Sequence, residues 1–325
     1  MRRVAALLAA ALLAALTGCG GGGAEPGAPK GATLVLDFQP NAVHSGIYAA
    51  QANGYFKEAG LDLHIQEPSS TADSAKLLET GRADFAVMDI NDFGIARERG
   101  LDLVAIAAIV QRPLASVIAR DPSEIRTPAD LAGKTVGVTG VPSDDAVLDT
   151  VLRSGGVDPS SVHRVTIGFN AVADLAAGKV DAATAFWNAE GVELQQRGIP
   201  IREFRVDQFG APHYPELVVA TTPDACDEVP GFLAALRHGY ATLGSDPDQA
   251  LDDLLDQVRG LDRGSQQAQL HALISADAFS VRAGSAPAAA LAGQSTSAWA
   301  QWAVEHGVIG PSADAKVAAG FAGCG

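Results

Sequence analysis

Basic residues are scarce in this chain. Its 325 residues include 23 Lys and Arg against 38 Asp and Glu, which gives a formal net charge of −15 at pH 7. A surface with this excess of negative charge repels the phosphates of nucleic acid and the headgroups of anionic lipids. The composition therefore argues against both as partners.

The short motifs of common catalytic and nucleotide-binding sites are absent as well. The sequence has no HExxH, no CxxC, no GxSxG nucleophile elbow and no P-loop, and its seven His lack the spacing of metal ligands. We therefore expect no metal, no cofactor and no catalytic residue. The pattern favours a binding protein over an enzyme.

Cysteine occurs at three positions, and the first, Cys19, ends a leader-like segment. Arg2 and Arg3 precede an unbroken apolar run at 4–16, which is short for a bilayer span and typical of a signal peptide. The letters LTGC at the end of this segment resemble a bacterial lipobox. We predict a signal peptide at 1–18 and lipidation of Cys19; the alternative is an ordinary signal peptide with a chance cysteine.

Residues 19–32 are dominated by Gly and Pro and contain nothing that could pack. We expect them to form a flexible linker behind the lipid anchor. Such a tether would hold the rest of the chain outside the cytoplasm, next to the cell membrane but not buried in it.

The other two cysteines, Cys226 and Cys324, form an even pair. Outside the cytoplasm such a pair is plausibly a disulfide, which here would pin the C-terminal tail to the body. Two free thiols are the alternative, and we favour the disulfide.

From residue 33 onward, short β-rich runs alternate with helical runs. Strands are predicted at 33–38, 61–65, 83–88, 101–110, 134–140, 162–169, 180–186, 201–206 and 215–222. Helices are predicted at 44–59 with an interruption at Gly54, at 71–80, at 91–99, and almost continuously from Val229. This alternation indicates an α/β fold with mainly parallel sheet covered by helices.

The alternation breaks at residues 111–120, where one strand follows another across Pro113 with no helix between them. At such a break the chain can pass from one lobe to a second. In the following unit a helix is predicted from about residue 142 to Gly155, with Ser143 as its candidate N-cap.

Six segments occur in an order and at spacings that resemble the substrate-binding proteins of bacterial ABC importers, in the branch that binds pyrimidine precursors of thiamine. They are LDFQPNAVHSGIYAAQANGYFKEAGLDL (36–63), GRADFAVM (81–88), DLAGKTVGV (130–138), GVPSDDAVL (140–148), GKVDAATAFWNAEGVEL (178–194) and PELVVATT (215–222). The resemblance spans about residues 33–305. The wider family also includes binders of nitrate, taurine and alkanesulfonate, and pyrimidine synthases.

The resemblance implies a bilobed periplasmic-binding-protein fold of type II, with two mixed, mainly parallel sheets flanked by helices and two hinge crossings. The first lobe would comprise 33–112 plus 223–325, and the second lobe 113–222. Ligand would bind between them and draw them together.

Open α/β sheets bind ligands beyond the carboxyl ends of their strands, so polar and aromatic residues there are the candidates. In the first lobe these are Asp37, Phe38, Asn41, His44, Tyr48 and Asp89. In the second lobe they are Ser143, Trp187, Asn188 and Glu190. The same argument marks Phe169–Asn170 without giving it a role.

Aromatic rings offer flat walls, and we prefer Trp187 to Phe186 for that role. Asp37 and Glu190 accept hydrogen bonds when ionised, Asn41 both donates and accepts, and His44 does either according to its tautomer.

Structural alternatives stay open for several of these residues. Asp37 could instead cap the next turn, and His44 could be a satisfied ring at the start of a helix. Tyr48 could be packing, and Ser143 could act only as a cap.

These groups suit an aminopyrimidine, which needs ring faces and hydrogen-bond acceptors. We predict a monomeric protein that captures such a solute and delivers it to an ABC permease and its ATPase subunit. One alternative is the same fold binding an alkanesulfonate, taurine, nitrate or riboflavin, with Arg112 as the residue to hold an anion. Another is an enzyme related to the pyrimidine synthases.

Overall fold

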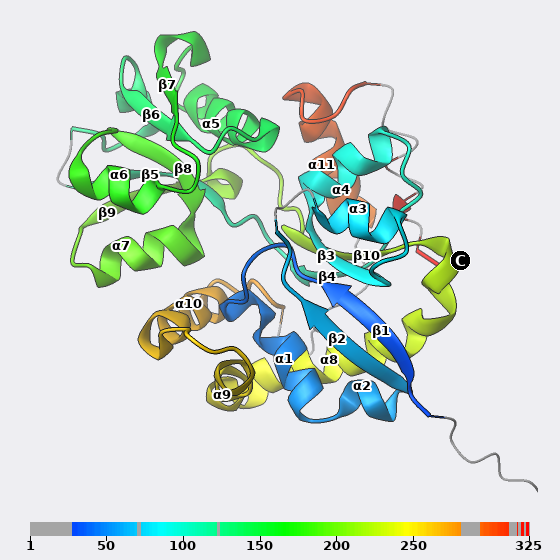
Figure 1. Cartoon of the computed structure of the whole chain (residues 1–325). Coiled ribbons are helices and arrows are strands. Elements are labelled where there is room, and N and C mark those ends of the chain that lie inside the picture. Colours follow the sequence, from blue (N-terminus) through cyan, green and yellow to red (C-terminus); the bar gives the residue numbers. More distant parts are fainter. Residues whose placement is uncertain are drawn as a thin grey trace, which may run out of the picture.

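The computed structural model describes residues 28–69, 73–121, 124–280 and 293–311, and five positions of the C-terminal tail. These five are Val317, Gly320, Phe321, Gly323 and Cys324. The predicted signal peptide, Cys19 and most of the predicted linker lie outside the described residues. Within them, two five-stranded sheets form the centres of two lobes, each flanked by helices (Figure 1).

The first sheet has the strand order β2-β1-β3-β10-β4. Its strands are β1 (Lys30–Val35), β2 (Leu61–Gln66), β3 (Phe85–Asp89), β4 (Val104–Val110) and β10 (Leu217–Thr221). β1 pairs in parallel with β2 and β3, and β10 lies antiparallel between β3 and β4. The central strands are apolar almost throughout because helices cover both faces of the sheet.

The second sheet repeats this plan in the order β7-β6-β8-β5-β9. Its strands are β5 (Ala115–Arg120), β6 (Thr135–Val138), β7 (His163–Thr166), β8 (Ala182–Phe186) and β9 (Ile201–Arg205). β6 pairs in parallel with β7 and β8, and β5 lies antiparallel between β8 and β9. The antiparallel strand of each sheet, β10 in the first and β5 in the second, is the strand that the chain forms on entering from the other lobe.

The chain crosses between the lobes twice. The first crossing, at 111–114, lies where the break in alternation predicted it, but the second occupies 209–216 and precedes β10. The prediction that 215–222 completes the second lobe is therefore wrong, because β10 belongs to the first sheet. Local periodicity identifies a strand but not a partner more than 100 residues away.

Helices surround both sheets. Those of the first lobe are α1 (Ser45–Ala52), α2 (Tyr55–Glu58), α3 (Asp73–Glu79), α4 (Ile90–Glu98), α8 (Val229–Ser245), α9 (Pro247–Gln257), α10 (Arg263–Ser275) and α11 (Gly293–Glu305). Those of the second are α5 (Pro142–Ser154), α6 (Ala171–Ala177), the π-helical turn η4 (Trp187–Gly191) and α7 (Val192–Gln196). The interruption predicted at Gly54 is confirmed, with φ of 77° between α1 and α2.

The apolar cores do not stop at the lobe boundary. Trp187 of the second lobe and Leu114 of the first crossing belong to the same apolar cluster as residues of α1, α8 and α10 in the first lobe. On the other side α11 contributes Trp302, whose Nε1 donates to Thr150 Oγ1 of α5 at 3.0 Å. The lobes are thus joined by packed side chains as well as by two chain crossings.

The predicted disulfide between Cys226 and Cys324 is confirmed, with the two Cα atoms 5.6 Å apart. It joins the C-terminal tail to the short helix η6 (Pro223–Glu228), which leads into α8. None of the helices in the described part of the chain is both long and apolar enough to cross a membrane.

Candidate ligand-binding site

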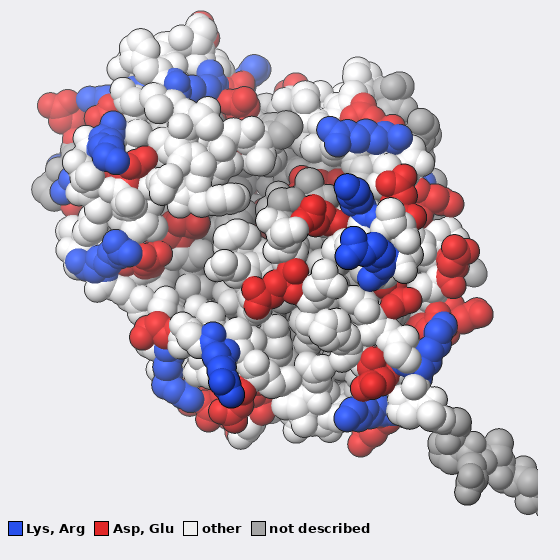
Figure 2. Space-filling model, in the orientation of Figure 1, with Lys and Arg blue, Asp and Glu red and all other residues white. Residues whose placement is uncertain are grey.

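Large apolar side chains that remain exposed gather at strand ends. Among the described residues they are Phe38, Val141, Val165, Phe169 and Phe186. Phe38 follows β1, Phe186 ends β8, and Phe169 stands between β7 and α6. The rings of Phe38 and Phe169 are in contact although they come from different lobes. The carboxyl ends of the two sheets therefore face each other, and Figure 2 shows the surface hollowed between the lobes.

Asp37, Asn41 and His44 form one closed turn after β1, which runs into the short helix η1 (Ala42–His44). The imidazole of His44 is fully buried; its Nδ1 accepts the Asn41 backbone N–H at 3.1 Å, and its Nε2 lies 2.8 Å from Asp37 Oδ1. Because a backbone N–H can only donate, Nδ1 carries no proton and Nε2 donates to Asp37. His44 is thus a satisfied ring that positions the carboxylate, and the Asp37 side chain keeps 18% of its surface exposed.

The side chain of Asn41 also has local partners. Its Oδ1 accepts the Val43 backbone N–H at 3.0 Å, and its Nδ2 donates to the Gln39 carbonyl at 3.0 Å. These bonds make Asn41 the N-cap of η1. In this structure its amide therefore shapes the turn that carries Asp37.

The turn at residues 41–44 is held by helices α1 and α8, which pack closely against each other. A Cβ at Gly239 would lie 2.0 Å from the Gly46 carbonyl oxygen, and one at Gly46 would lie 2.5 Å from the ring of Tyr240. Only residues without a side chain permit this approach. The Tyr240 hydroxyl donates to the Val43 carbonyl at 2.8 Å, and burial raises the pKa of this hydroxyl well above its usual value.

Carboxyl groups gather where β3 ends. Asp89 caps α4 by accepting the N–H of Asn91 at 2.6 Å, and burial raises the pKa of its carboxyl. In the first turn of α4, burial followed by the charges of Asp89 and Asp37 raises the pKa of Asp92 to about 7. Sequence reasoning did not mark Asp92, because nothing in the local pattern shows its burial.

Glu216 connects the two crossings at this same edge. It is 1% exposed, and its Oε2 accepts the Leu114 backbone N–H at 2.7 Å. Burial, and then the charge of Asp89, raise the pKa of Glu216 well above its usual value, and its carboxyl is hydrogen-bonded to that of Asp89. A protonated Glu216 donating to Asp89 accounts for two buried acids in contact.

In the second lobe, Asn188 and Glu190 share the π-helical turn η4 directly after β8. Glu190 Oε2 accepts the backbone N–H of Phe186 at 3.0 Å, and burial raises the pKa of its carboxyl. Asn188 is 3% exposed, and its Oδ1 has no hydrogen-bond partner within the described residues. Single π turns are frequent at functional sites. This one folds the Glu190 carboxylate back over the end of β8, beside the exposed ring of Phe186.

The structure corrects the preference for Trp187 as a ligand wall. Trp187 is 1% exposed, its Nε1 donates to the Pro113 carbonyl at 3.0 Å, and the guanidinium of Arg205 lies 4.1 Å from the centroid of its ring. Phe186, which precedes it, is 40% exposed. Consecutive residues at a strand end point to opposite faces, so only one of the two rings can face solvent.

Ser143 is not the N-cap of α5. The helix begins at Pro142, whose missing N–H suits the first helical position, and Val141 is the capping residue. The side chain that closes this loop is Asp144, which accepts the backbone N–H of Thr139 at 2.5 Å and also its hydroxyl. Ser143 lies half-buried in the first turn.

Tyr48 is not brought to the facing strand ends. It is 6% exposed and lines a separate hollow of about 490 Å³ on the first lobe. The other residues of this hollow are Gln51, His64, Ile65, Glu67, Gln257, Val258 and Arg259. Burial raises the pKa of the Tyr48 hydroxyl to about 12.

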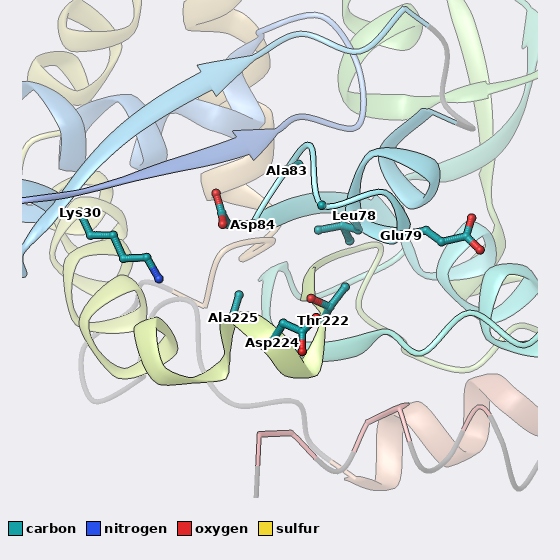
Figure 3. Close-up of a pocket in the computed structure, with 9 residues that line it drawn as sticks. Lys30, Leu78, Glu79, Ala83, Asp84, Thr222, Asp224 and Ala225 are labelled. Atoms are coloured by element: carbon teal, nitrogen blue, oxygen red, sulfur yellow. The ribbon is translucent and has the colours of Figure 1, made fainter.

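A smaller hollow, of about 160 Å³, lies at the other end of the first sheet, where its parallel strands begin. Lys30 of β1, Asp84 just before β3 and Asp224 of η6 are among the residues that line it (Figure 3). It is formed where strands β1 and β3 begin rather than where they end, so it shares no residue with the candidate site.

The groups that meet at the candidate site are ring faces and carboxylates. Arg112, the candidate for an anion, is engaged at the hinge: its Nη2 lies 2.5 Å from Asp207 Oδ2, and its Nη1 donates to the Ala276 carbonyl at 2.9 Å. The described part of the chain contains no group of His, Cys, Asp and Glu arranged to hold a metal ion. Rings with carboxylate acceptors are suited to a flat solute with N–H donors.

Comparison with known proteins gives a consistent family. The family model described as NMT1/THI5 like matches residues 41–250. A formylaminopyrimidine-binding protein of Halalkalibacterium halodurans is 34% identical over 227 residues, covering 68% of this chain and 69% of that protein. A putative thiamine biosynthesis protein of Haemophilus influenzae is 32% identical, covering 67% and 70%. A 4-amino-5-hydroxymethyl-2-methylpyrimidine phosphate synthase of Legionella pneumophila is 28% identical, covering 70% and 73%.

Solved structures share the fold. The periplasmic aliphatic sulphonate-binding protein of Escherichia coli superposes with a TM-score of 0.72 at 16% identity, covering 88% of this chain and 96% of that one. The alkanesulfonate-binding protein of Xanthomonas axonopodis pv. citri gives a TM-score of 0.66 at 18% identity, covering 87% and 95%. The predicted bilobed periplasmic-binding-protein fold is confirmed.

Proposed function

Because the chain belongs to the NMT1/THI5-like family, we propose that it is an extracytoplasmic binding protein that captures a pyrimidine precursor of thiamine for an ABC importer. The observation that carries this proposal is the presence of exposed rings and carboxylates at the facing strand ends of the two lobes, where Phe38 and Phe169 touch. Phe38 and Asp37 come from the first lobe, and Phe186 and Glu190 from the second.

An aminopyrimidine matches these groups one by one. Its ring has two flat faces, which stack on aromatic side chains with offset geometry. Its exocyclic amino group donates two hydrogen bonds, which a carboxylate accepts most strongly. Asp37, oriented by His44, and Glu190, held by the Phe186 N–H, are acceptors whose geometry exists before the ligand arrives.

Capture proceeds by closure of the lobes around the solute. A ligand that contacts both lobes only in the closed state stabilises that state by its differential affinity. Moving the population from almost all open to almost all closed requires about 5.5 kcal/mol. Stacking together with a few charge-assisted hydrogen bonds supplies energy of this order.

Delivery would require partners that the chain does not contain. A permease would recognise the closed form, and ATP hydrolysis would take place on another polypeptide, since the sequence has no P-loop. The lipobox-like segment ending at Cys19 supports anchoring as a lipoprotein. Replacing Cys19 by Ser should release the protein from the membrane fraction, and retention of the variant there would contradict the anchor.

The pyrimidine synthases among the relatives favour a second candidate, an enzyme. The family resemblance assigns those synthases a pyridoxal-bearing lysine. Of the described lysines, Lys30, Lys134 and Lys179 stand at or just before the beginning of strands β1, β6 and β8. These three therefore lie at the ends of the sheets opposite the candidate site, which supports binding without turnover. The other two described lysines, Lys57 and Lys76, are exposed on α2 and α3.

A thermal-shift panel with purified protein tests the proposal. The panel holds a formylaminopyrimidine, 4-amino-5-hydroxymethyl-2-methylpyrimidine, thiamine, riboflavin, taurine and nitrate. A solute that binds only the folded state at 100 times its Kd should stabilise the protein by about 2.7 kcal/mol. We expect the single-ring aminopyrimidines to raise the melting temperature; a response to taurine or nitrate alone would refute the proposal. A Schiff-base absorption band on addition of pyridoxal phosphate would favour the enzyme.

A further inference from the structure

Phe38 and Phe169 touch across the gap between the lobes. Their ring centroids are 5.8 Å apart and their planes are inclined at 46°. Phe38 is 42% exposed and Phe169 is 73% exposed. Two exposed rings from different lobes thus meet each other while each keeps a large part of its surface in water.

The two rings lie closer to the solvent than the carboxylate of Asp37 does. The side chain of Asp37, next to Phe38 in sequence, is 18% exposed, and the His44 ring that holds it is fully buried. Exposure therefore increases from the carboxylate outward to Phe38 and then to Phe169. This order places the pair of rings at the mouth of the candidate site and the Asp37 carboxylate beneath it.

The distance between the rings leaves no room for a third ring. Aromatic carbons in contact lie about 3.5–4.0 Å apart, so a flat ligand inserted between two rings needs their centroids about 7–8 Å apart. At 5.8 Å the pair is closed to such an insertion. A solute held by the carboxylates must therefore fit beneath the pair or force it apart.

We infer that Phe169 is a lid residue: its contact with Phe38 closes the mouth of the site and restricts the ligand to a single ring. This inference rests on the proposed function, since it concerns the same site. On this inference an aminopyrimidine with a short substituent binds beneath the closed pair without moving it. Thiamine carries the same aminopyrimidine joined to a second ring, and its second ring must separate Phe38 from Phe169.

Selectivity between these two solutes is the first test. Dissociation constants for 4-amino-5-hydroxymethyl-2-methylpyrimidine and for thiamine are measured by calorimetry on the wild type and three variants. In Phe169→Ala we expect the single-ring solute to bind about 2- to 12-fold more weakly, because an aromatic contact between the lobes is lost. Thiamine should bind no worse, so the preference for the single ring falls by that factor.

The other two variants serve as controls. Phe169→Tyr keeps the ring and should retain the wild-type preference. Val165→Ala removes another exposed apolar side chain, on the nearby strand β7, and should change neither constant. A Phe169→Ala protein with the wild-type preference, or a Val165→Ala protein with the same loss, would overturn the inference.

If the wild type binds neither solute, the proposed function fails. The contact between Phe38 and Phe169 can then still be tested by measuring the distance between the lobes. Spin labels at Asp62→Cys and His163→Cys, both at exposed positions of different lobes, report the lobe separation in ligand-free protein carrying Cys19→Ser. Phe169→Ala should broaden the distribution toward longer distances, whereas Val165→Ala should not. An unchanged distribution in Phe169→Ala would show that the two rings do not hold the lobes together.

Discussion

Replacing Glu190 by Gln separates an amino-bearing ligand from an anionic one. In the structure Glu190 Oε2 accepts the Phe186 N–H at 3.0 Å. A Gln side chain has one oxygen, and if that oxygen keeps this bond, the amide NH₂ occupies the place of the second acceptor. The ligand amino group then loses a charge-assisted hydrogen bond, which contributes about 1.5–3 kcal/mol. We expect Glu190→Gln to weaken aminopyrimidine binding by roughly 10- to 150-fold.

The assay is isothermal calorimetry across a range of pH. Burial raises the pKa of Glu190, and the ionised carboxylate accepts from the ligand more strongly than the protonated acid, so wild-type affinity should fall as the pH drops through this raised pKa. Glu190→Gln should lose that dependence. Glu193→Gln is the matched control, since Glu193 is 43% exposed and paired with Arg197 one turn along. The charge of Glu193 makes a lesser contribution to the raised pKa of Glu190, so this control should keep the pH dependence with its midpoint moved to lower pH. Aminopyrimidine binding by Glu190→Gln within twofold of the wild type would refute the reasoning, and an anion should bind the variant no worse.

Three further predictions concern stability and the ring assignments. Replacing Cys226 and Cys324 by Ser opens a loop with a sequence separation of 98, which should cost up to about 4.7 kcal/mol of unfolding free energy and lower the urea midpoint. The pKa of Asp92 is raised to about 7, so the native state binds an extra proton between about pH 4 and 7, and stability is lost as pH rises through that window. Asp92→Asn should therefore gain up to about 4 kcal/mol relative to the wild type above pH 7 and much less at pH 4, as urea titrations at both pH values would show. Trp187→Phe should destabilise the fold by about 1–3 kcal/mol with little change in ligand Kd, whereas Phe186→Ala should weaken binding with little change in melting temperature.

The α/β alternation was readable from the sequence because it rests on local periodicity. The interruption at Gly54, the break at Pro113 and the helical region from Val229 all match the structure. The sheet to which β10 belongs was not readable, since its partners are distant in sequence. The length of the predicted linker also differed: β1 begins at Lys30, inside it, because pairing with β2 extends the strand beyond its apolar run.

The candidate site was only partly predictable for a related reason. Strand ends can be found from sequence, so Asp37, Phe38 and Glu190 were predicted as candidates without the structure, and the structure places them at strand ends. Burial cannot be found in that way, and it distinguishes Trp187 in the core from Phe186 in solvent. The contact of Phe38 with a second ring depends on how two lobes meet, which no local signal records.

The glycine contact between α1 and α8 has a consequence for the rate of capture. Gly46 and Gly239 bring the two helices into close contact, and the Tyr240 hydroxyl of α8 holds the turn that bears Asp37 through the Val43 carbonyl. The conformational entropy of this turn is lost when the protein folds, so little more is lost when a solute binds. Under the proposed function, the first lobe therefore presents a preformed turn to the solute, and the rate of capture should depend on the movement of the second lobe.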